Sequence, residues 1–256
     1  MNKNREPGTA PVLIVTGGSR GIGAAVCRAA ADNGYAVALN YLNSSSRAEH
    51  VADHIRRDGG DVITIKCDVS NEREVIKLFN DTADQLGPIS GLVNNAGILE
   101  TQMDVVDMTP ARIDRIFATN VRGSFLCARE AIRHMAKSHG GSGGAIVNLS
   151  SAAARLGSPH EYVDYAASKG AIDAMTIGLS KEVAVEGIRV NAVRPGFIDT
   201  EMHASGGEPG RLERVKSSIP LGRGGRAEEV ASAVMWLLSE QASYCTGALI
   251  DISGGR

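Results

Sequence analysis

Short apolar stretches recur along the chain and are separated by longer segments of mixed polarity. Most of these stretches are rich in valine and isoleucine, and they are bounded by glycine, proline, asparagine or aspartate. That pattern is typical of strands buried inside a sheet. The predicted strands are residues 12–16, 36–41, 62–67, 89–94, 145–150, 188–193 and 248–252.

The segments between these strands place apolar residues three and four positions apart, which puts them on one face of a helix. The residues that form such stripes are Val75, Phe79 and Leu86; Ile113, Phe117, Val121, Phe125, Ala128, Ile132 and Met135; and Ile172, Met175, Leu179 and Val183. The second stripe predicts one long helix that includes Asn120.

Alternating strands and helices favour a parallel sheet with helices on both faces. Because right-handed crossovers leave few topologies, we expect an α/β, doubly wound, seven-stranded Rossmann-type fold. A single domain is expected over 11–256, after a disordered lead at 1–10. Only the glycine-rich, polar residues 203–225 break the alternation. They predict a substrate lid at about 200–225, and the alternative is a tolerated surface insertion.

Composition excludes some classes of protein. The net charge of −2 gives no electrostatic basis for binding nucleic acid or an anionic membrane. No apolar run approaches the roughly 18 residues that a membrane-spanning helix needs, and the first residues lack the apolar core of a secretory signal. The cysteines at 27, 67, 127 and 245 form no CxxC pair. They fit reduced thiols in a cytoplasmic protein without a metal site.

The first predicted strand runs into TGGSRGIG at residues 16–23. Glycine lets the backbone turn sharply and approach a phosphate without a Cβ in the way. The free N–H groups and the dipole of the following helix attract an anion. Glycines alone are a weak signal, because many strand–helix turns use them structurally. At the first such turn of an α/β chain, however, they predict a dinucleotide site.

Tyr165 and Lys169 lie four residues apart, so on a helix their side chains share a face. A free tyrosine has a pKa of about 10 and is a poor base at neutral pH. A nearby ammonium group stabilises the phenolate. We therefore expect Lys169 to lower the pKa of Tyr165 toward the range where acid–base catalysis is efficient. The alternative is an ordinary surface pair.

Several motifs in order make the chain resemble the short-chain dehydrogenase/reductase family. They are TGGSRGIG at 16–23, CDV at 67–69, NNAG at 94–97, a Ser–Tyr–Lys set at 151, 165 and 169, RPGFIDT at 194–200, and GALIDISGG near the C-terminus. The chain is similar to bacterial glucose-dehydrogenase-like and carbonyl-reductase-like members. The resemblance implies an oxidoreductase that interconverts an alcohol and a carbonyl by hydride transfer to or from a nicotinamide cofactor.

The resemblance implies a role for each catalytic residue. Tyr165 is the general acid and base, Lys169 lowers its pKa and binds the nicotinamide ribose, and Ser151 polarises the substrate oxygen. Asn120 supports a proton relay. Two alternatives stay open: Ser150 could replace Ser151, and Asn120 could be a structural residue at a helix kink.

The resemblance also implies a cofactor site. Asp68 is expected beside the adenine ring, although it could instead, or also, cap the following helix. The complete expected set is Gly17, Ser19, Arg20, Gly21, Ile22, Gly23, Asn40, Tyr41, Ser44, Asp68, Val69, Asn94, Ala96, Gly97, Pro195, Gly196, Ile198 and Thr200.

The second predicted strand indicates which cofactor is preferred. An NAD site usually carries an acidic residue near the end of that strand, where it accepts from the ribose 2′-OH. Tyr41 occupies this position in the resemblance. Arg20 is expected to bind a 2′-phosphate, with Ser44 nearby and Arg47 as a weaker second cation. We therefore expect NADP(H) to be preferred, with NAD possible. The alternative is that Arg20 is a solvated loop residue and that the site does not distinguish a ribose with a 2′-phosphate from one without it.

Five residues flank the catalytic elements and are expected to bind the substrate: Arg155, His160, Tyr162, Met202 and His203. The substrate is expected to be a small alcohol or carbonyl, such as a sugar, a polyol, a keto compound or a quinone. By resemblance, the long apolar helices and the apolar C-terminal strand predict a homotetramer, with a dimer as the alternative. Two other classes remain open: a non-catalytic NADP-binding sensor or scaffold on the same fold, and a nucleotide-sugar epimerase or dehydratase.

Overall fold

The computed structural model describes residues 10–202 and 206–256, so most of the predicted N-terminal lead falls outside it. Within these residues, seven strands form one parallel sheet in the order β3-β2-β1-β4-β5-β6-β7. The strands are β1 (Val12–Val15), β2 (Ala36–Tyr41), β3 (Val62–Lys66), β4 (Ile89–Asn94), β5 (Gly144–Leu149), β6 (Ile188–Pro195) and β7 (Leu249–Ile252). The strand order reverses at β1 and β4, and in open α/β sheets ligands bind beyond the carboxyl ends of the strands at such a point.

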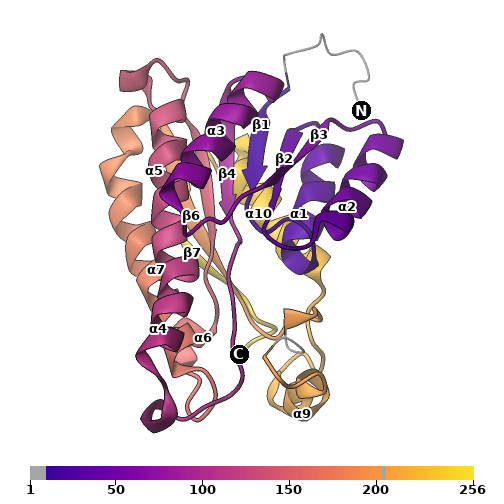
Figure 1. Cartoon of the computed structure of the whole chain (residues 1–256), viewed down its shortest axis with the longest axis vertical. Helices are drawn as coiled ribbons and strands as arrows, with labels where there is room; N and C mark the ends of the chain where they lie inside the picture. The colour runs from indigo at the N-terminus through magenta and orange to yellow at the C-terminus, as the bar shows by residue number, and fades with distance from the viewer. Residues whose placement is uncertain (1–9, 203–205) are drawn as a thin grey trace.

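Helices cover both faces of the sheet (Figure 1). One face carries α1 (Gly21–Asp32), α2 (Ser45–Arg57) and α10 (Ala227–Leu238). The other carries α3 (Glu72–Leu86), α5 (Gly123–Met135) and α7 (Val163–Glu182), with α4 (Pro110–Phe117) leading into α5. Shorter helical segments are η1 (Val105–Asp107), η3 (Lys137–His139), α6 (Ala153–Leu156), η4 (Ala184–Glu186), α9 (Arg211–Val215), η5 (Lys216–Ser218) and η6 (Glu240–Ala242).

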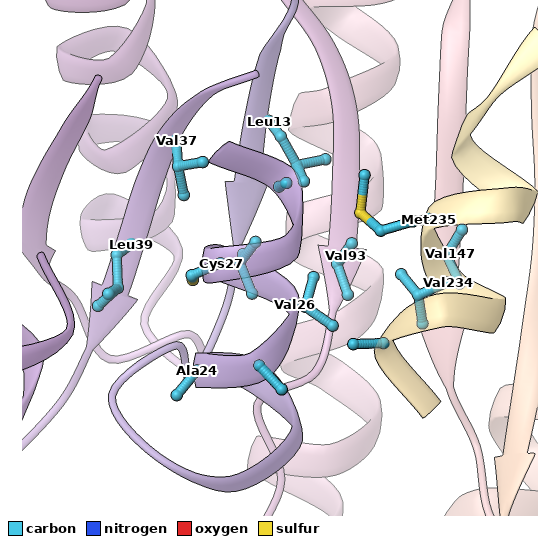
Figure 2. Close-up of a cluster of buried hydrophobic side chains, with 14 of the residues drawn as sticks. Leu13, Ala24, Val26, Cys27, Val37, Leu39, Val93, Val147, Val234 and Met235 are labelled. Carbon is cyan, nitrogen blue, oxygen red and sulfur yellow. The ribbon is translucent and has the colours of Figure 1, made fainter. Parts of the chain in front are cut away.

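The core consists of two apolar layers, one on each face of the sheet. Figure 2 shows the layer in which Leu13 and Val93 of the sheet lie near Val26 of α1 and Val234 of α10. These four side chains are fully buried. Burying a valine or leucine side chain contributes about 1.5–3 kcal/mol relative to leaving it exposed. The helices are therefore held to the sheet mainly by this burial, which keeps the loops at the carboxyl ends of the strands in place.

The structure confirms the predicted α/β doubly wound sheet. The predicted strands 36–41 and 89–94 coincide with β2 and β4, and the other predicted strands differ by one or two residues at their ends. No helix in the described part of the chain is both long enough and apolar enough to cross a membrane.

The predicted long helix through Asn120 is interrupted by a π-helical turn. α4 ends at Phe117, and Ala118–Arg122 forms a π-helical turn, η2, before α5 begins. A π turn inserts an extra residue into a helix, so one apolar stripe cannot stay on a single face through it. Ile113 and Phe125 of the predicted stripe are accordingly 39% and 51% exposed.

Candidate active site

Two cavities adjoin at the carboxyl ends of the strands, and Met202 lines both. We call the first the cofactor cavity, because the glycine-rich loop after β1 forms one wall of it. The expected residues that line it are Gly17, Ser19, Arg20, Gly21, Ile22, Asn40, Tyr41, Ser44, Asp68, Val69, Ala96, Gly97 and Thr200. We call the second the catalytic cavity, because both Ser151 and Tyr165 line it.

The glycine-rich loop has the geometry of a phosphate-binding turn. Gly17 and Gly21 adopt φ values of +65° and +54°, which favour glycine. A Cβ on Gly17 would lie 3.0 Å from the Cα of Ala96, so a side chain would crowd the loop. Within the described residues, no side chain caps the amides at the start of α1, and no acidic residue lies in its first turn. Those amides can therefore donate to an anion, so the loop fits the diphosphate of a dinucleotide.

Asn95, which the sequence analysis did not select, holds this loop against β4. Its Nδ2 donates to the carbonyl oxygens of Thr16 (2.8 Å) and Gly17 (3.0 Å). The Thr16 hydroxyl accepts from the amides of Asn95 and Ala96, both at 3.0 Å. Asn95 also lines the cofactor cavity. The signal was present in NNAG, where two asparagines follow each other, but we selected the first.

Asn94 does not line the cofactor cavity, contrary to expectation. Its side chain is buried, and Nδ2 donates to Asn148 Oδ1 (3.0 Å) and to the carbonyl oxygen of Ser124 (3.1 Å). These bonds join β4 to β5 and α5. Successive residues of a strand point to opposite faces, so the side chain of Asn94 points into the protein and not into the cofactor cavity. There its hydrogen bonds stabilise the sheet.

Four other expected cofactor residues also lie away from the cofactor cavity. Gly23 has a packing role, because a Cβ there would lie 2.4 Å from the carbonyl oxygen of Gly17. Pro195 and Gly196 line the catalytic cavity instead. Ile198 is only 5% exposed, and its carbonyl oxygen accepts weakly from the Thr200 hydroxyl at 3.5 Å.

Asp68 lines the cofactor cavity and does not cap the following helix, so the alternative role considered for it is wrong. Its Oδ1 accepts from the amide (2.9 Å) and the hydroxyl (2.7 Å) of Ser70. The N-cap of α3 is Asn71, whose side chain accepts from the amides of Arg73 and Glu74. The Asp68 carboxylate is thus oriented by a local turn at the edge of the cavity.

A carboxylate stands between the two arginines expected to bind a 2′-phosphate. Glu201 lines the cofactor cavity and forms an ion pair with Arg47. It also lies 3.8 Å from Arg20. Tyr41 occupies the end of β2, and its hydroxyl donates to Ser45 Oγ at 3.3 Å. No local pattern in the sequence indicates Glu201, because the residue is far from the arginines along the chain.

The structure separates the two candidate serines. Ser150 is buried, and its hydroxyl contacts Asp173 Oδ1 (2.7 Å) and the carbonyl oxygen of Lys169 (3.2 Å). Ser151 lines the catalytic cavity together with Tyr165, and it acts to lower the pKa of the Tyr165 phenol. Ser151 therefore has the geometry to act on a substrate oxygen beside Tyr165.

Tyr165 and Lys169 share one face of α7, as predicted, with Nζ 5.6 Å from the ring centroid. Lys169 is buried, and Nζ donates to the carbonyl oxygen of Leu149 at 2.6 Å. Burial lowers the pKa of Lys169 to about 8, against an opposing effect of Asp173. A lysine in this range can exchange protons near neutral pH.

The expected lowering of the Tyr165 pKa was wrong for the groups of the chain itself. Burial raises the pKa of Tyr165, and this effect exceeds the lowering by Ser151 and by the charge of Arg211. The reason is that removing a phenolate from water favours the neutral phenol. Tyr165 therefore stays protonated at neutral pH.

Asn120 lies in the π-helical turn and is fully buried. Its Oδ1 accepts from the amide of Ile98 (2.8 Å), and Nδ2 donates to the carbonyl oxygen of Ile98 (3.1 Å) and to Ser168 Oγ (3.1 Å). A Cβ added to Gly97 would lie 3.4 Å from Asn120 Oδ1 and 3.6 Å from Lys169 Nζ. Asn120 thus joins the loop after β4 to α7, next to Lys169.

Among the expected substrate residues, Tyr162 and Met202 line the catalytic cavity. Arg155 and His160 do not: Arg155 lies 3.2 Å from a carboxylate oxygen of Asp251, and the exposed His160 lies 2.9 Å from Asp104. Both are held by neighbouring carboxylates on the surface. His203 belongs to the three residues, 203–205, that the structure does not describe.

The residues of the catalytic cavity that the sequence did not predict include Phe197, Arg211 and Arg256. Arg211 comes from α9, inside the predicted lid, and Arg256 follows β7. The polar composition of the predicted lid was the feature of the sequence that could have indicated Arg211. In the part of the chain that the structure describes, no group of three or more His, Cys, Asp or Glu side chains could hold a metal ion.

The fold and these two cavities define a nucleotide-binding oxidoreductase scaffold, and the chain belongs to the short-chain dehydrogenase/reductase family. The family model described as enoyl-(acyl carrier protein) reductase matches residues 17–256. Over 245 residues the chain is 58% identical to the uncharacterized oxidoreductase YgfF of Escherichia coli (strain K12), covering 96% of this chain and 99% of that protein. The resemblance inferred from the motifs is confirmed.

Two further relatives bear on the chemistry. The chain is 35% identical to glucose 1-dehydrogenase 2 of Bacillus subtilis (strain 168) over 247 residues, covering 96% of this chain and 95% of that protein. It also superposes with a TM-score of 0.89 on a short chain dehydrogenase from Burkholderia cenocepacia J2315 in complex with NADP, at 32% identity. That match covers 98% of this chain and 99% of the other.

Proposed function

We propose that this protein is an NADP(H)-dependent oxidoreductase that interconverts an alcohol and a carbonyl. The observation that carries the proposal is that Ser151 and Tyr165 lie together on the wall of the catalytic cavity, next to the glycine-lined cofactor cavity. A bound nicotinamide cofactor would supply or accept the hydride.

The chain supplies the proton and the position of the substrate oxygen. Tyr165 donates its phenolic proton to the carbonyl oxygen during reduction, and Ser151 donates a second hydrogen bond that polarises the carbonyl. Because burial raises the pKa of Tyr165, the phenol is in its acid form at neutral pH. This protonation state favours the reductive direction.

Lys169 and Asn120 support the reaction from behind Tyr165. We assign the protonated Lys169 to orienting the nicotinamide ribose and to returning a proton toward the phenol. Its pKa of about 8 suits proton exchange at neutral pH. Asn120, which contacts Ser168 and the Ile98 backbone, is assigned to holding the proton path that ends at Lys169.

The preference for NADP(H) rests on Arg20, which lines the cofactor cavity, and on Arg47, which pairs with Glu201 of the same cavity. Tyr41 stands at the position where an NAD enzyme usually carries a carboxylate. The complex of the Burkholderia relative with NADP supports the same choice. Glu201 pairs with both arginines and is expected to compete with a 2′-phosphate for them.

A turnover assay tests the proposed function. Purified protein is given NADPH or NADH with a panel of carbonyls, and NADP⁺ or NAD⁺ with the matching alcohols. We expect turnover with NADPH, and a loss of at least about 10²-fold in Tyr165→Phe, which keeps the ring but removes the proton. Tyr165→Phe should still bind NADPH. Binding of NADPH by the wild type without turnover of any carbonyl or alcohol would favour the non-catalytic sensor.

We also propose a homotetramer that works in the cytoplasm. Phe125 on α5 and Ile177 on α7 are 51% and 41% exposed, which leaves apolar surface on the helices expected to associate. Cys27, Cys67 and Cys127 are free and buried, as suits a reducing compartment.

The segment containing α9 is proposed as the substrate lid, since Arg211 of α9 lines the catalytic cavity.

A further inference from the structure

The described part of the catalytic cavity carries an unexpected charge. Its charged lining residues are two arginines, Arg211 and Arg256. The Arg211 guanidinium lies 4.5 Å from the ring centroid of Tyr162 and 5.3 Å from that of Phe197. Arg256 lies 4.8 Å from the Phe197 centroid. The aromatic rings therefore hold both cations beside the reacting groups, and the wall of the cavity is positive.

Arg211 is only 6% exposed, yet its hydrogen bonding is incomplete. Its Nη2 pairs with Glu161, whereas its Nε is buried and has no acceptor among the described residues. A guanidinium offers five N–H donors, and a buried donor without an acceptor is costly. The same side chain lines the cavity, so its guanidinium has hydrogen-bonding capacity that no described residue uses.

Glu161 is shared between two arginines, so it is not the counter-ion of Arg211 only. Its other oxygen accepts from Arg214 Nη2 at 2.7 Å, and Arg214 Nε donates to Glu208 at 2.5 Å. Two arginines and two glutamates thus form one cluster, and Arg256 contributes a further positive charge to the cavity. The charge of Arg211 reaches the reactive phenol, because it acts to lower the pKa of Tyr165.

We propose that the substrate is a small carbonyl compound that carries a carboxylate, an oxo acid that is reduced to a hydroxy acid. The carboxylate accepts hydrogen bonds from the Arg211 guanidinium, whose planar donors match a carboxylate. Leu99, Leu156 and Met202 line the same cavity and face the carbon chain. This inference rests on the proposed function and narrows its substrate class.

The reaction balances without another reactant. The carbonyl carbon accepts the hydride of NADPH, and its oxygen takes the proton of Tyr165, so the products are the hydroxy acid and NADP⁺. The tyrosinate is then reprotonated from solvent by way of Lys169. The carboxylate does not react, and its contact with Arg211 serves to orient the carbonyl toward Ser151 and Tyr165.

The test compares acids with neutral analogues. The probes are 2-, 3- and 4-oxo acids of four to six carbons, each paired with its amide, and the readout is kcat/KM with NADPH. We expect the wild type to prefer at least one acid by about 10- to 100-fold, the range of a charge-assisted hydrogen bond. Arg211→Gln should lower kcat/KM for the acid by about 10- to 100-fold more than for its amide, which removes the preference.

Arg214→Gln is the matched control. Arg214 shares Glu161 with Arg211 but does not line the catalytic cavity, so this variant should keep the preference for the acid. NADPH affinity and the melting temperature of each variant show whether it is folded. If kcat/KM falls equally for acid and amide in both variants, Arg211 only stabilises the lid through its ion pairs. That result would overturn the inference. So would a wild type that reduces amide and acid equally well.

A binding measurement separates this inference from the proposed function. Pentanoate and pentanamide, which cannot be reduced by hydride transfer here, are titrated calorimetrically into the wild type and Arg211→Gln in the presence of NADP⁺. Tighter binding of pentanoate, lost in Arg211→Gln, supports the carboxylate site even if no carbonyl is turned over. If neutral carbonyls are turned over but pentanoate binds no more tightly than pentanamide, the proposed function is supported and the carboxylate site is refuted.

Discussion

Arg112 of α4 and Asp164 of α7 form an ion pair at 2.7 Å, although both side chains are only 3% exposed. The Asp164 carboxylate also accepts from the amide of Tyr165 at 2.8 Å, and Arg112 Nη1 donates to the carbonyl oxygen of Thr101 at 2.7 Å. This pair therefore connects α4, the loop after β4 and Tyr165 at the start of α7.

Removing one partner of that pair should be costly. We expect Arg112→Met to lower the free energy of unfolding by about 3–5 kcal/mol, since it leaves the Asp164 charge buried and unpaired. The double variant Arg112→Met/Asp164→Leu should recover part of that loss, because no charge then remains buried. Urea unfolding of the three proteins measures this. A single variant as stable as the wild type would contradict it.

The two serines should differ in their effect on catalysis. Ser151→Ala removes a hydroxyl that lines the catalytic cavity and should lower kcat by about 10²- to 10³-fold, as when an oxyanion donor is lost. Ser150→Ala removes a buried hydrogen bond to Asp173 and should mainly lower stability, by about 1–3 kcal/mol. Steady-state kinetics and thermal unfolding of both variants give the comparison. The reverse pattern would return the catalytic role to Ser150.

Lys169 should make the stability of the fold depend on pH. Its folded pKa is about 8, below its ordinary value of 10.5. Between these pH values the unfolded chain binds more protons, so the wild type gains stability as pH rises through this window. From pH 7 to 9.5 it should gain about 2 kcal/mol relative to Lys169→Met, which has nothing to titrate there. Chemical unfolding at both pH values measures the difference, and parallel behaviour of the two proteins would refute the burial effect.

Cofactor preference should respond in opposite directions to two substitutions in the cofactor cavity. Arg20→Ala should weaken NADPH binding by about 10-fold and leave NADH binding almost unchanged, because only NADPH carries the 2′-phosphate. Glu201→Gln should strengthen NADPH binding by a few-fold, since an exposed ion pair is worth up to about 1 kcal/mol.

The control is Arg28→Ala, which removes an arginine of α1 that pairs with Glu228 and does not line the cofactor cavity. Fluorescence titration of both nucleotides against all four proteins decides the assignment. A wild type that favours NADH, or equal losses of both nucleotides in Arg20→Ala, would overturn it.

Assembly should depend on the exposed apolar surface of α5. Phe125→Glu places a charge where the proposed tetramer buries an aromatic ring, so the mass measured by light scattering at micromolar concentration should fall to half or less. Val106→Glu is the control, since Val106 is 89% exposed and belongs to η1, not to α5 or α7. A monomeric wild type would exclude the tetramer.

Local patterns along the sequence determined the architecture of this protein. The apolar runs located each strand to within one or two residues, because burial on both faces of a parallel sheet requires such runs. The four-residue spacing of Tyr165 and Lys169 sufficed to place them on one face of α7, since a helix repeats every 3.6 residues. The glycines of the first loop likewise identified the turn that faces the cofactor cavity.

The tertiary structure alone decided which of two adjacent residues enters a cavity. Asn94 and Asn95, and likewise Ser150 and Ser151, stand where strands end, and successive side chains there point to opposite sides. If the end of a strand is predicted wrongly by one residue, the side chain assigned to the cavity is therefore the structural one and not its functional neighbour. Arg211, Arg256 and Glu201 reach the cavities from distant parts of the chain, which no local pattern records. The pKa of Tyr165 depends on how deeply the fold buries it, and burial is a property of the whole structure.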